Sequence, residues 1–388
     1  MTQDYLKKKI IRTATVPLSL DLFCRGFLRE LSEEYEVVAV SSPLPELAQI
    51  ARREGVRTIA VPMERKMAPL RDLVSLFRLI RVFRREKPDM VHSITPKAGL
   101  LSMLAARLTR VPVRVHMFTG LLFPYAKGWR RNVFWLTDRL TAACATHVIP
   151  EGEGVRNDLL TSGVTNKPLK VLGNGNMRGI DLTFYTRTAE ILEKASAIRS
   201  SCGISGNAFA FLFVGRFDRD KGLGELVRAF RLLEHDGADV HLLLVGAEEP
   251  DGKPLSEATK HLIASSPRIH VSDGWQADVR PWYAAADALV HPSYREGFPN
   301  VVIEAGAMGL SSIVTDINGS REIIHDGTNG LIIPSHDEEA LYEAMKRFAT
   351  NPEVVHSMAS TARDNVADRY EQDYVRQCIK GFYHRVLQ

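Results

Sequence analysis

The stretch FLFVGRFDRDKGLGELVRAF, residues 211–230, reads as a strand, a turn and a helix in succession. Its apolar run ends at Gly215, the polar turn contains Arg216 and Lys221, and Gly222 opens the helical pattern. Such units build open parallel α/β sheets, which bind ligands at the carboxyl ends of their strands. Two cations beside the start of a helix suit a diphosphate, whereas the alternative is a solvated turn whose basic residues bind nothing.

The same alternation of short apolar runs and helical patterns extends through the chain and predicts two Rossmann-like domains with doubly wound parallel sheets. We expect first-half strands over residues 9–13, 36–41, 57–61, 90–93, 113–118 and 147–150, with helices over 21–32, 45–54, 70–86 and 99–109. Second-half strands are expected over 208–214, 240–245, 269–271, 288–291 and 312–315. The loop GNGNMRGID, residues 173–181, is the expected crossover. The predicted domains are 1–182 and 183–367, with a C-terminal helix, 368–388, packing back on the first domain.

The composition is that of an ordinary folded protein. Of 388 residues, 45% are hydrophobic and 25% charged, which excludes a disordered or fibrous chain. The four cysteines have neither zinc-site nor disulfide-framework spacing, and the N-terminus lacks the apolar core of a signal peptide. These features predict a cytoplasmic location.

Charge is distributed unevenly between the two halves. Residues 1–180 contain 29 Lys and Arg against 16 Asp and Glu, a net charge of +13, and the remainder contains 21 against 30, a net charge of −9. The first half is therefore expected to meet an anionic partner: nucleic acid, lipid head groups or a phosphorylated ligand.

A second motif lies in ALVHPSYREGFPNVVIEAGAMG, residues 288–309. A strand ends near His291, Glu296 lies in the turn, and a helix begins near Pro299 or Asn300 and contains Glu304. Two carboxylates flanking free backbone N–H groups suit a nucleotide-sugar, with sugar and ribose hydroxyls on the carboxylates and phosphate on the amides. The alternative is one acid at a helix start and one buried acid satisfied by backbone.

Together the two motifs resemble glycosyltransferase family 4, retaining enzymes of the GT-B fold, in which two Rossmann-like domains face a cleft. The resemblance extends through LLVGAEE, DGWQADVRPWYAAADALVHPS and TDINGSREIIHDGTNGLIIP. It implies catalytic roles for Glu296, Arg216 and Lys221. It also implies donor binding by Arg216, Lys221, Gly297, Phe298, Pro299, Asn300, Val301 and Glu304.

The first half, through VHSITPKAGLLSMLAARL and GNGNMRGID, resembles bacterial members that extend lipid-linked saccharides for capsule, O-antigen or glycoprotein assembly. Its expected acceptor-binding residues are Ser93, Thr95, Lys97, Thr119 and Gly120. Where many relatives have His-Gly, this chain has Thr119-Gly120, which leaves open whether Thr119 or His116 aids catalysis. Alternatively, Ser93 and Thr95 cap a helix and Lys97 is solvated.

No metal or other cofactor is expected. Asp218 and Asp220 form the Asp-x-Asp pattern of metal-dependent transferases, but they precede a helix, where aspartate is a favoured N-cap. The glycines at 173, 175 and 179 miss the dinucleotide-binding spacing by one residue. The family implies that cations replace a metal and that a donor phosphate oxygen takes the acceptor proton.

The segment PLRDLVSLFRLIRVFRREKP, residues 69–88, predicts a basic amphipathic helix. Such a helix lies on an anionic bilayer or packs on the sheet with a solvated basic face. Basic and aromatic residues of KGWRRNVFW, residues 127–135, and the charge excess favour peripheral contact with the inner face of the plasma membrane.

The resulting hypothesis is a retaining, metal-independent transferase that moves a sugar from a UDP-sugar to a saccharide acceptor on a polyprenyl diphosphate, without nucleic acid as a partner. One alternative is a GT-B nucleotide-sugar 2-epimerase, which needs no acceptor. The other is a non-enzymatic basic-surface binding protein, which leaves the Arg/Lys and Glu/Glu motifs unexplained.

Overall fold

The computed structural model describes residues 7–249 and 252–388 and divides the chain into two units, each built around a six-stranded parallel sheet. Unit 1 contains the residues up to Gly179 together with Asp373–Gln388, and unit 2 contains Ile180–Gln372. The chain passes between them in the Gly- and Asn-rich loop that the sequence marks as the crossover.

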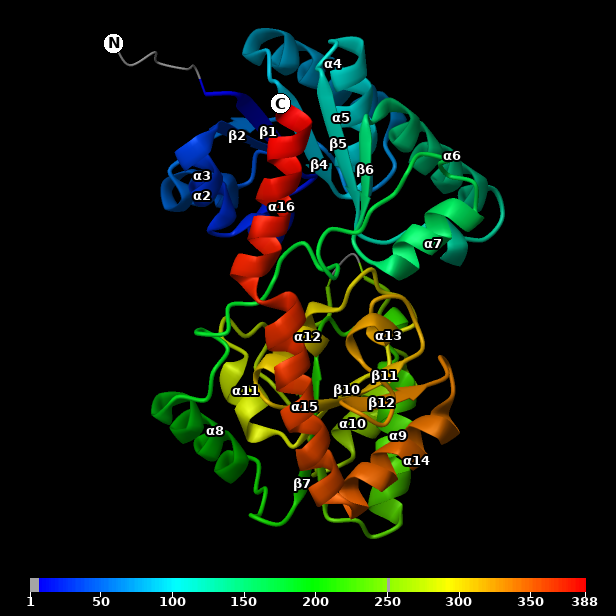
Figure 1. The fold of residues 1–388 in the computed structure, drawn as a ribbon. Coiled ribbons are helices and arrows are strands. Elements are labelled where there is room, and N and C mark those ends of the chain that lie inside the picture. The colour runs from blue at the N-terminus through cyan, green and yellow to red at the C-terminus, as the bar shows by residue number, and fades with distance from the viewer. Residues whose placement is uncertain (1–6, 250–251) are drawn as a thin grey trace. The chain divides into compact units, whose positions relative to one another are not determined.

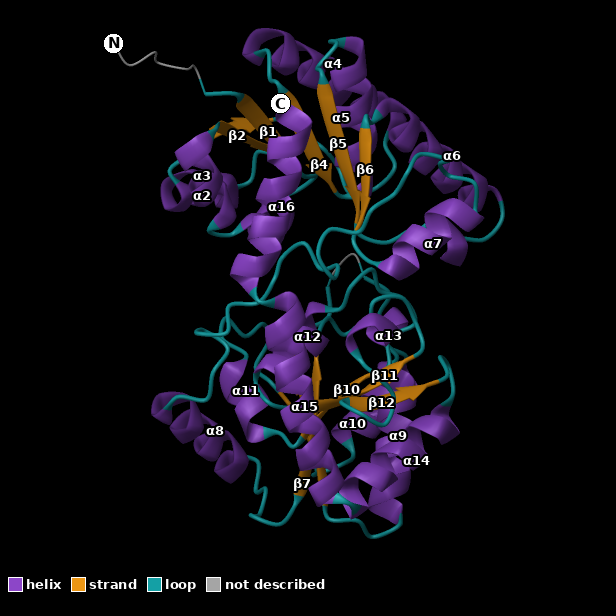
Figure 2. Ribbon diagram, viewed as in Figure 1, coloured by secondary structure: helices purple, strands orange, loops and turns teal. Residues whose placement is uncertain are grey.

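The sheet of unit 1 has the strand order β3-β2-β1-β4-β5-β6 (Figures 1 and 2). Its strands are β1 (Lys9–Thr13), β2 (Glu36–Ser41), β3 (Arg57–Ala60), β4 (Met90–Ile94), β5 (Val113–Phe118) and β6 (His147–Pro150). Its helices are α1 (Pro17–Cys24), α2 (Phe27–Glu34), α3 (Pro45–Glu54), α4 (Pro69–Glu86), α5 (Pro96–Leu108), the 3₁₀ turn η1 (Phe123–Tyr125), α6 (Trp129–Cys144), α7 (Glu153–Thr161) and α16 (Gln372–Leu387).

Both faces of this sheet are covered because neighbouring residues of a strand point to opposite sides. Ile10 packs in a core with α1, α2, α3 and α16, whereas Ile11 packs in a second core with α4, α5 and α6. Helices on both faces leave the two ends of the strands as the accessible edges.

Unit 2 has the strand order β12-β11-β10-β7-β8-β9. Its strands are β7 (Phe209–Val214), β8 (Val240–Val245), β9 (Ile269–Val271), β10 (Ala288–His291), β11 (Ser311–Thr315) and β12 (Gly330–Ile333). Its helices are α8 (Ala189–Ser201), the 3₁₀ turn η2 (Arg219–Lys221), α9 (Leu223–His235), α10 (Glu257–Ala264), α11 (Arg280–Ala285), α12 (Asn300–Ala307), α13 (Ser320–Ile323), α14 (Glu338–Thr350) and α15 (Pro352–Tyr370). Alternate residues of β7 again enter separate cores, Phe211 with α9 and α14 and Leu212 with α8, α12 and α15.

One expected helix is wrong, and one strand was missed. The helix expected over 21–32 is two helices, because Gly26 takes a left-handed conformation with φ of 75° and separates α1 from α2. Strand β12 was not expected, since its four residues end immediately before Pro334 and form too short a run for the periodicity to reveal.

Helix α16 closes one face of unit 1 through both apolar and polar contacts (Figure 1). Its Tyr383 is fully buried, and the hydroxyl accepts a hydrogen bond from the Arg12 guanidinium and lies 2.6 Å from His92 Nδ1. The Arg12 guanidinium contacts the side chains of His92, Tyr383 and Cys24, so the tyrosine oxygen provides part of its hydrogen bonding in the core.

Candidate functional site

The carboxyl edge of unit 2 brings the loop after β7 against the loop after β10. Gly222, between η2 and α9, has φ of 70°, and a Cβ atom there would lie 2.1 Å from the Pro292 carbonyl oxygen. Only glycine permits this approach without displacing backbone. The two motifs, about 75 residues apart in sequence, therefore meet at one place.

At that place Lys221 and Glu296 form an ion pair. Lys221 Nζ lies 2.5 Å from Glu296 Oε1, and His291 Nε2 lies 3.1 Å from the same oxygen. The side chains of Lys221 and Glu296 are each 17% exposed, whereas that of His291 is 1% exposed. The carboxylate is thus held between a partly accessible ammonium and a buried imidazole.

Glu296 remains ionised in this environment. Burial alone would raise its pKa, but the charge of Lys221 and the hydrogen bond from His291 outweigh burial and hold the pKa far below its ordinary value. Burial lowers the pKa of His291, which keeps the ring neutral. The site therefore presents a carboxylate and an ammonium side by side at neutral pH.

Arg216 follows the same strand as Lys221 but has a different partner. Its guanidinium Nη1 lies 3.2 Å from Glu249 Oε2, and the side chain is about half exposed. No contact of Arg216 with Lys221 or Glu296 is found in residues 7–249 and 252–388. Its ion pair is of the exposed kind that exchanges readily for another anion.

Helix α12 begins beside the carboxylate, at Asn300, after the extended residue Pro299. The N–H groups of Asn300 and Val301 are in its first turn, where they have no intrahelical acceptor. Gly297 and Phe298 pack against Gly319, where a Cβ atom would lie 2.6 Å from the Gly297 carbonyl oxygen. The loop from Glu296 to the helix is therefore tightly held by backbone packing.

Glu304 lies one turn into α12 and is 6% exposed. Tyr283 donates its hydroxyl hydrogen to Glu304 Oε2 over 3.1 Å. Both predicted carboxylates thus lie on the segment that begins at β10, Glu296 in the loop and Glu304 in the helix.

Asp218 and Asp220 are engaged by groups of the protein. Asp218 accepts hydrogen bonds from the backbone N–H groups of Asp220 at 2.9 Å and Lys253 at 2.9 Å, so it caps η2. Asp220 pairs with Lys253 and Arg295 at 2.7 and 3.0 Å. Across the described residues, no cluster of three or more His, Cys, Asp or Glu side chains has the arrangement of a metal site.

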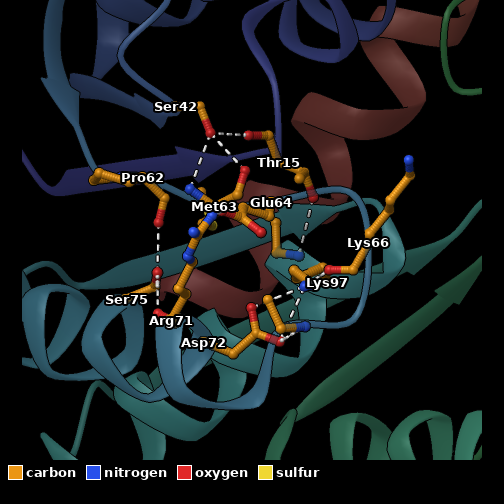
Figure 3. A network of polar contacts seen from close by, with 12 residues as sticks. Thr15, Ser42, Pro62, Met63, Glu64, Lys66, Arg71, Asp72, Ser75 and Lys97 are labelled. Atoms are coloured by element: carbon orange, nitrogen blue, oxygen red, sulfur yellow. Dashed lines mark hydrogen bonds and ion pairs between the residues drawn. The ribbon is translucent and has the colours of Figure 1, made fainter. Parts of the chain in front are cut away.

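The carboxyl edge of unit 1 has its own polar network, drawn in Figure 3. Thr15, after β1, donates its backbone N–H to Thr95 Oγ1 over 3.1 Å, and the two hydroxyls are 2.8 Å apart. Thr95 has φ of 74°, an unusual value for a β-branched residue, and directly precedes α5. Lys97, in the first turn of α5, lies 2.8 Å from Asp72 of α4. Lys97 also donates to the Lys66 carbonyl oxygen.

The other predicted acceptor residues differ in position. Ser93 is fully buried and its hydroxyl lies 2.8 Å from His116 Nδ1, so Ser93 neither reaches the surface nor caps α5. His116 is also buried, and burial lowers its pKa to about 3. Its ring fills the space beside Gly99, where a Cβ atom would lie 2.2 Å away. Thr119 and Gly120 follow β5 and are partly exposed.

Helix α4 presents an apolar stripe to the surface. Leu79 and Phe83 are buried against the sheet, but Leu70, Leu73, Val74 and Phe77 are exposed, with Leu70 83% exposed. The exposed arginines of the helix are Arg71, Arg78, Arg81, Arg84 and Arg85. One face of the helix packs on the sheet, as one of the two expectations has it, and another face is exposed. Contact of the exposed face with a bilayer stays a prediction. None of the helices described is long and apolar enough to cross a bilayer.

His291 and Tyr283 were not singled out from the sequence as site residues. His291 is the last residue of β10, and the rule that ligands bind at strand carboxyl ends is the signal that points to it. Tyr283 comes from α11, and no local pattern indicates that its hydroxyl reaches Glu304.

Comparisons with known proteins identify both halves. A family model described as glycosyl transferases group 1 matches residues 208–351, and one described as a glycosyl transferase 4-like domain matches residues 23–175. The capsular polysaccharide biosynthesis glycosyltransferase CapM of Staphylococcus aureus is 29% identical over 389 residues, covering 98% of each chain. The UDP-Gal:alpha-D-GlcNAc-diphosphoundecaprenol alpha-1,3-galactosyltransferase of Escherichia coli is 26% identical and covers 95% of each chain.

Among solved structures, Anabaena HepE in complex with UDP is similar, with a TM-score of 0.80. The two chains are 17% identical, and the match covers 98% of this chain and 100% of HepE. At this identity the likeness establishes the shared two-domain fold.

Proposed function

We propose, because the chain belongs to the family 4 glycosyltransferases and has the GT-B fold, that it transfers a sugar from a UDP-sugar to a lipid-linked saccharide with retention of configuration. The observation that carries this proposal is the Lys221–Glu296 pair at the carboxyl edge of unit 2. Two curated relatives, named for capsular polysaccharide biosynthesis and for a diphosphoundecaprenol saccharide acceptor, support a role in surface polysaccharide assembly.

The proposed chemistry follows from where charge develops. When the bond between the sugar C1 and the β-phosphate oxygen breaks, negative charge grows on the diphosphate and the sugar becomes oxocarbenium-like. Arg216, Lys221 and the first N–H groups of α12 stabilise the departing UDP. The acceptor hydroxyl oxygen forms the new bond to C1, and its proton passes to a phosphate oxygen of the donor. No metal is required in this proposal.

The remaining groups of the unit 2 edge fix the donor. Glu296, held ionised, accepts hydrogen bonds from hydroxyls of the donor sugar, and Glu304 accepts from the ribose. Lys221 has three N–H donors and uses one on Glu296, so the others remain for the diphosphate.

For the acceptor we propose the carboxyl edge of unit 1, at Thr95, Lys97, Thr119 and Gly120. Ser93 is buried and contributes indirectly, because its hydroxyl hydrogen bonds the buried His116 ring and orients it. The ion pair between Lys97 and Asp72 connects Lys97 to the first turn of α4. The exposed apolar stripe of α4 begins in the same turn, with Leu70 and Leu73. An acceptor diphosphate at Lys97 would thus have its lipid near the stripe.

We further propose that α4 holds the enzyme on the inner face of the plasma membrane. Burying one exposed leucine or phenylalanine in lipid contributes about 1.5–3 kcal/mol, and each arginine near an anionic surface contributes about 1 kcal/mol. Leu70→Glu combined with Phe77→Glu should abolish sedimentation with phosphatidylglycerol vesicles. Leu232→Glu, at an exposed leucine of α9 in unit 2, is the matched control and should sediment like wild type.

The acceptor assignment is tested by kinetics. Lys97→Ala should raise the KM for a polyprenyl-diphosphate saccharide much more than that for the UDP-sugar. Asp72→Asn, which breaks the ion pair but keeps the ammonium, separates loss of the cation from loss of the pair. Equal effects on both substrates would refute acceptor binding at Lys97 and leave the transferase proposal standing.

The donor assignment is tested by titrating the protein with a panel of UDP-sugars and then adding the lipid-linked acceptor. Saturable binding of one UDP-sugar followed by acceptor-dependent release of UDP is the expected result. Conversion of the UDP-sugar to an isomer without UDP release would instead identify a 2-epimerase.

A further inference from the structure

His291 occupies a place in the unit 2 site that neither sequence motif assigns. It ends β10, and its Nε2 lies 3.1 Å from Glu296 Oε1, the oxygen that Lys221 also contacts. We propose that His291 is a positioning residue that orients the Glu296 carboxylate toward the donor sugar. This inference rests on the proposed function.

The environment of the ring holds it in one place. The His291 side chain is 1% exposed and stacks on Phe213, with ring centroids 6.4 Å apart and an interplanar angle of 17°. A buried aromatic ring on a strand has few alternative rotamers, so its hydrogen-bonding edge has a fixed direction.

The hydrogen-bond inventory assigns the proton. An ionised carboxylate only accepts hydrogen bonds, so Nε2 must carry the hydrogen that bonds Glu296. Nδ1 is buried and has no partner within the described chain. Left as a lone pair, Nδ1 is an unpaired acceptor, whereas the other tautomer would bury an unpaired N–H and lose the bond to Glu296. Neutral His291 with hydrogen on Nε2 is therefore the state that fits.

The two groups that contact Glu296 differ in stiffness. Lys221 reaches it through a flexible four-carbon chain and is needed at the diphosphate in the proposed reaction. His291 is rigid and has no other described hydrogen-bond partner. The hydrogen bond from His291 to Glu296 therefore stays constant while Lys221 contacts the phosphate. Lys221 and His291 both contact Glu296 Oε1. Glu296 Oε2 has no partner among the described residues, which leaves it to accept a hydrogen bond from a sugar hydroxyl.

The test compares His291→Phe with His291→Gln. Phenylalanine keeps the ring and its stacking on Phe213 but removes the N–H, and glutamine restores an N–H donor. His291→Phe should lower kcat for transfer from the UDP-sugar by about 10- to 100-fold, the effect of losing one hydrogen bond to a charged group. The Kd for UDP, which has no sugar for Glu296 to contact, should change less than about twofold. His291→Gln should recover most of kcat.

His241→Phe is the matched control. His241 is a buried histidine of the same unit, near the amino end of β8, and hydrogen bonds His270 over 3.0 Å. The His241→Phe variant should transfer the sugar at the wild-type rate.

Wild-type kcat in His291→Phe would overturn the inference, as would parallel losses of kcat and UDP affinity without rescue by glutamine, which indicate a purely structural role. A wild-type enzyme that turns over no UDP-sugar would instead refute the proposed function, and the inference would fall with it.

Discussion

Lys221 Nζ lies 2.5 Å from Glu296 Oε1, joining the turn after β7 to the loop after β10. The pair connects residues from two separate strands at the carboxyl edge of one sheet, where open α/β folds bind ligands. In the proposed reaction, the ammonium of this pair faces the diphosphate of the donor and the carboxylate faces hydroxyls of the donor sugar.

Removing either cation of this edge should slow donor turnover severely. Arg216→Ala and Lys221→Ala are each expected to lower kcat/KM for the UDP-sugar by about 100- to 1000-fold. In the proposed reaction, each substitution removes a positive charge that stabilises the leaving diphosphate. Circular dichroism should show an unchanged fold. Lys253→Ala, at an exposed lysine that pairs with Asp220, is the control and should remain active. Near-wild-type transfer by both site variants would remove the basis of the donor assignment.

The close approach at Gly222 offers a second prediction. Gly222→Ala should reduce transfer strongly, because the new Cβ would collide with the Pro292 carbonyl and move Lys221 away from Glu296. Gly237→Ala, at the other end of α9, has a similar φ of 78° but nothing within 4 Å of the added Cβ. Comparing kcat and thermal midpoints of the two variants separates backbone strain from displacement of the site. Equal losses of activity in both would contradict the prediction.

We expect full activity in excess EDTA, since cations of the protein take the place of a metal in the proposed mechanism. The carboxylates of Asp218 and Asp220 are already engaged by backbone N–H groups and by Lys253 and Arg295. The measurement is the transfer rate after chelation and after adding back Mg²⁺ or Mn²⁺. Activity lost on chelation and restored by either ion would contradict it.

Asp138 of α6 should make stability depend on pH. Burial raises its pKa to about 7, above its ordinary value of 3.8. The folded state therefore binds the proton more tightly than the unfolded state. As a result, the carboxyl group does not lower the free energy of unfolding at low pH, and it lowers it increasingly as pH rises from about 4 to about 7. Asp138→Asn should raise the free energy of unfolding at pH 8 by at most about 4 kcal/mol, and by little at pH 4. Urea titrations at both pH values measure this, and equal effects at both would refute it.

Tyr383 should be important for the attachment of α16. Tyr383→Phe removes the hydroxyl that accepts from Arg12 and contacts His92, so a buried guanidinium loses a partner. The expected cost is about 1–3 kcal/mol in the free energy of unfolding. Tyr374→Phe, at an exposed tyrosine of the same helix, is the control and should cost less.

Much of the fold could be predicted because strand and helix periods are local properties. Runs such as Phe209–Val214 are buried on both faces and are therefore continuously apolar. The break at Gly26 was missed because a left-handed glycine within an amphipathic pattern leaves the hydrophobic period intact on both sides.

Only those site residues that belong to a recognisable sequence motif could be predicted. Lys221 and Glu296 lie in turns with distinctive neighbours, whereas His291 looks like the end of an ordinary strand and gains its meaning only from the contact with Glu296. Ser93 illustrates the opposite case, since its position at the end of the expected strand suggested access, but its side chain contacts His116 in the core. Side-chain direction at the end of a strand depends on pleat and packing, which the motif does not specify.

The most direct test of the central claim is to measure UDP and glycosylated lipid together, with the preferred UDP-sugar and a polyprenyl-diphosphate saccharide. The proposed function predicts one UDP released for each sugar transferred, a product whose anomeric configuration matches the donor by NMR, and loss of both products in Lys221→Ala. UDP-sugar isomerised without UDP, or transfer unaffected by Lys221→Ala, would contradict it.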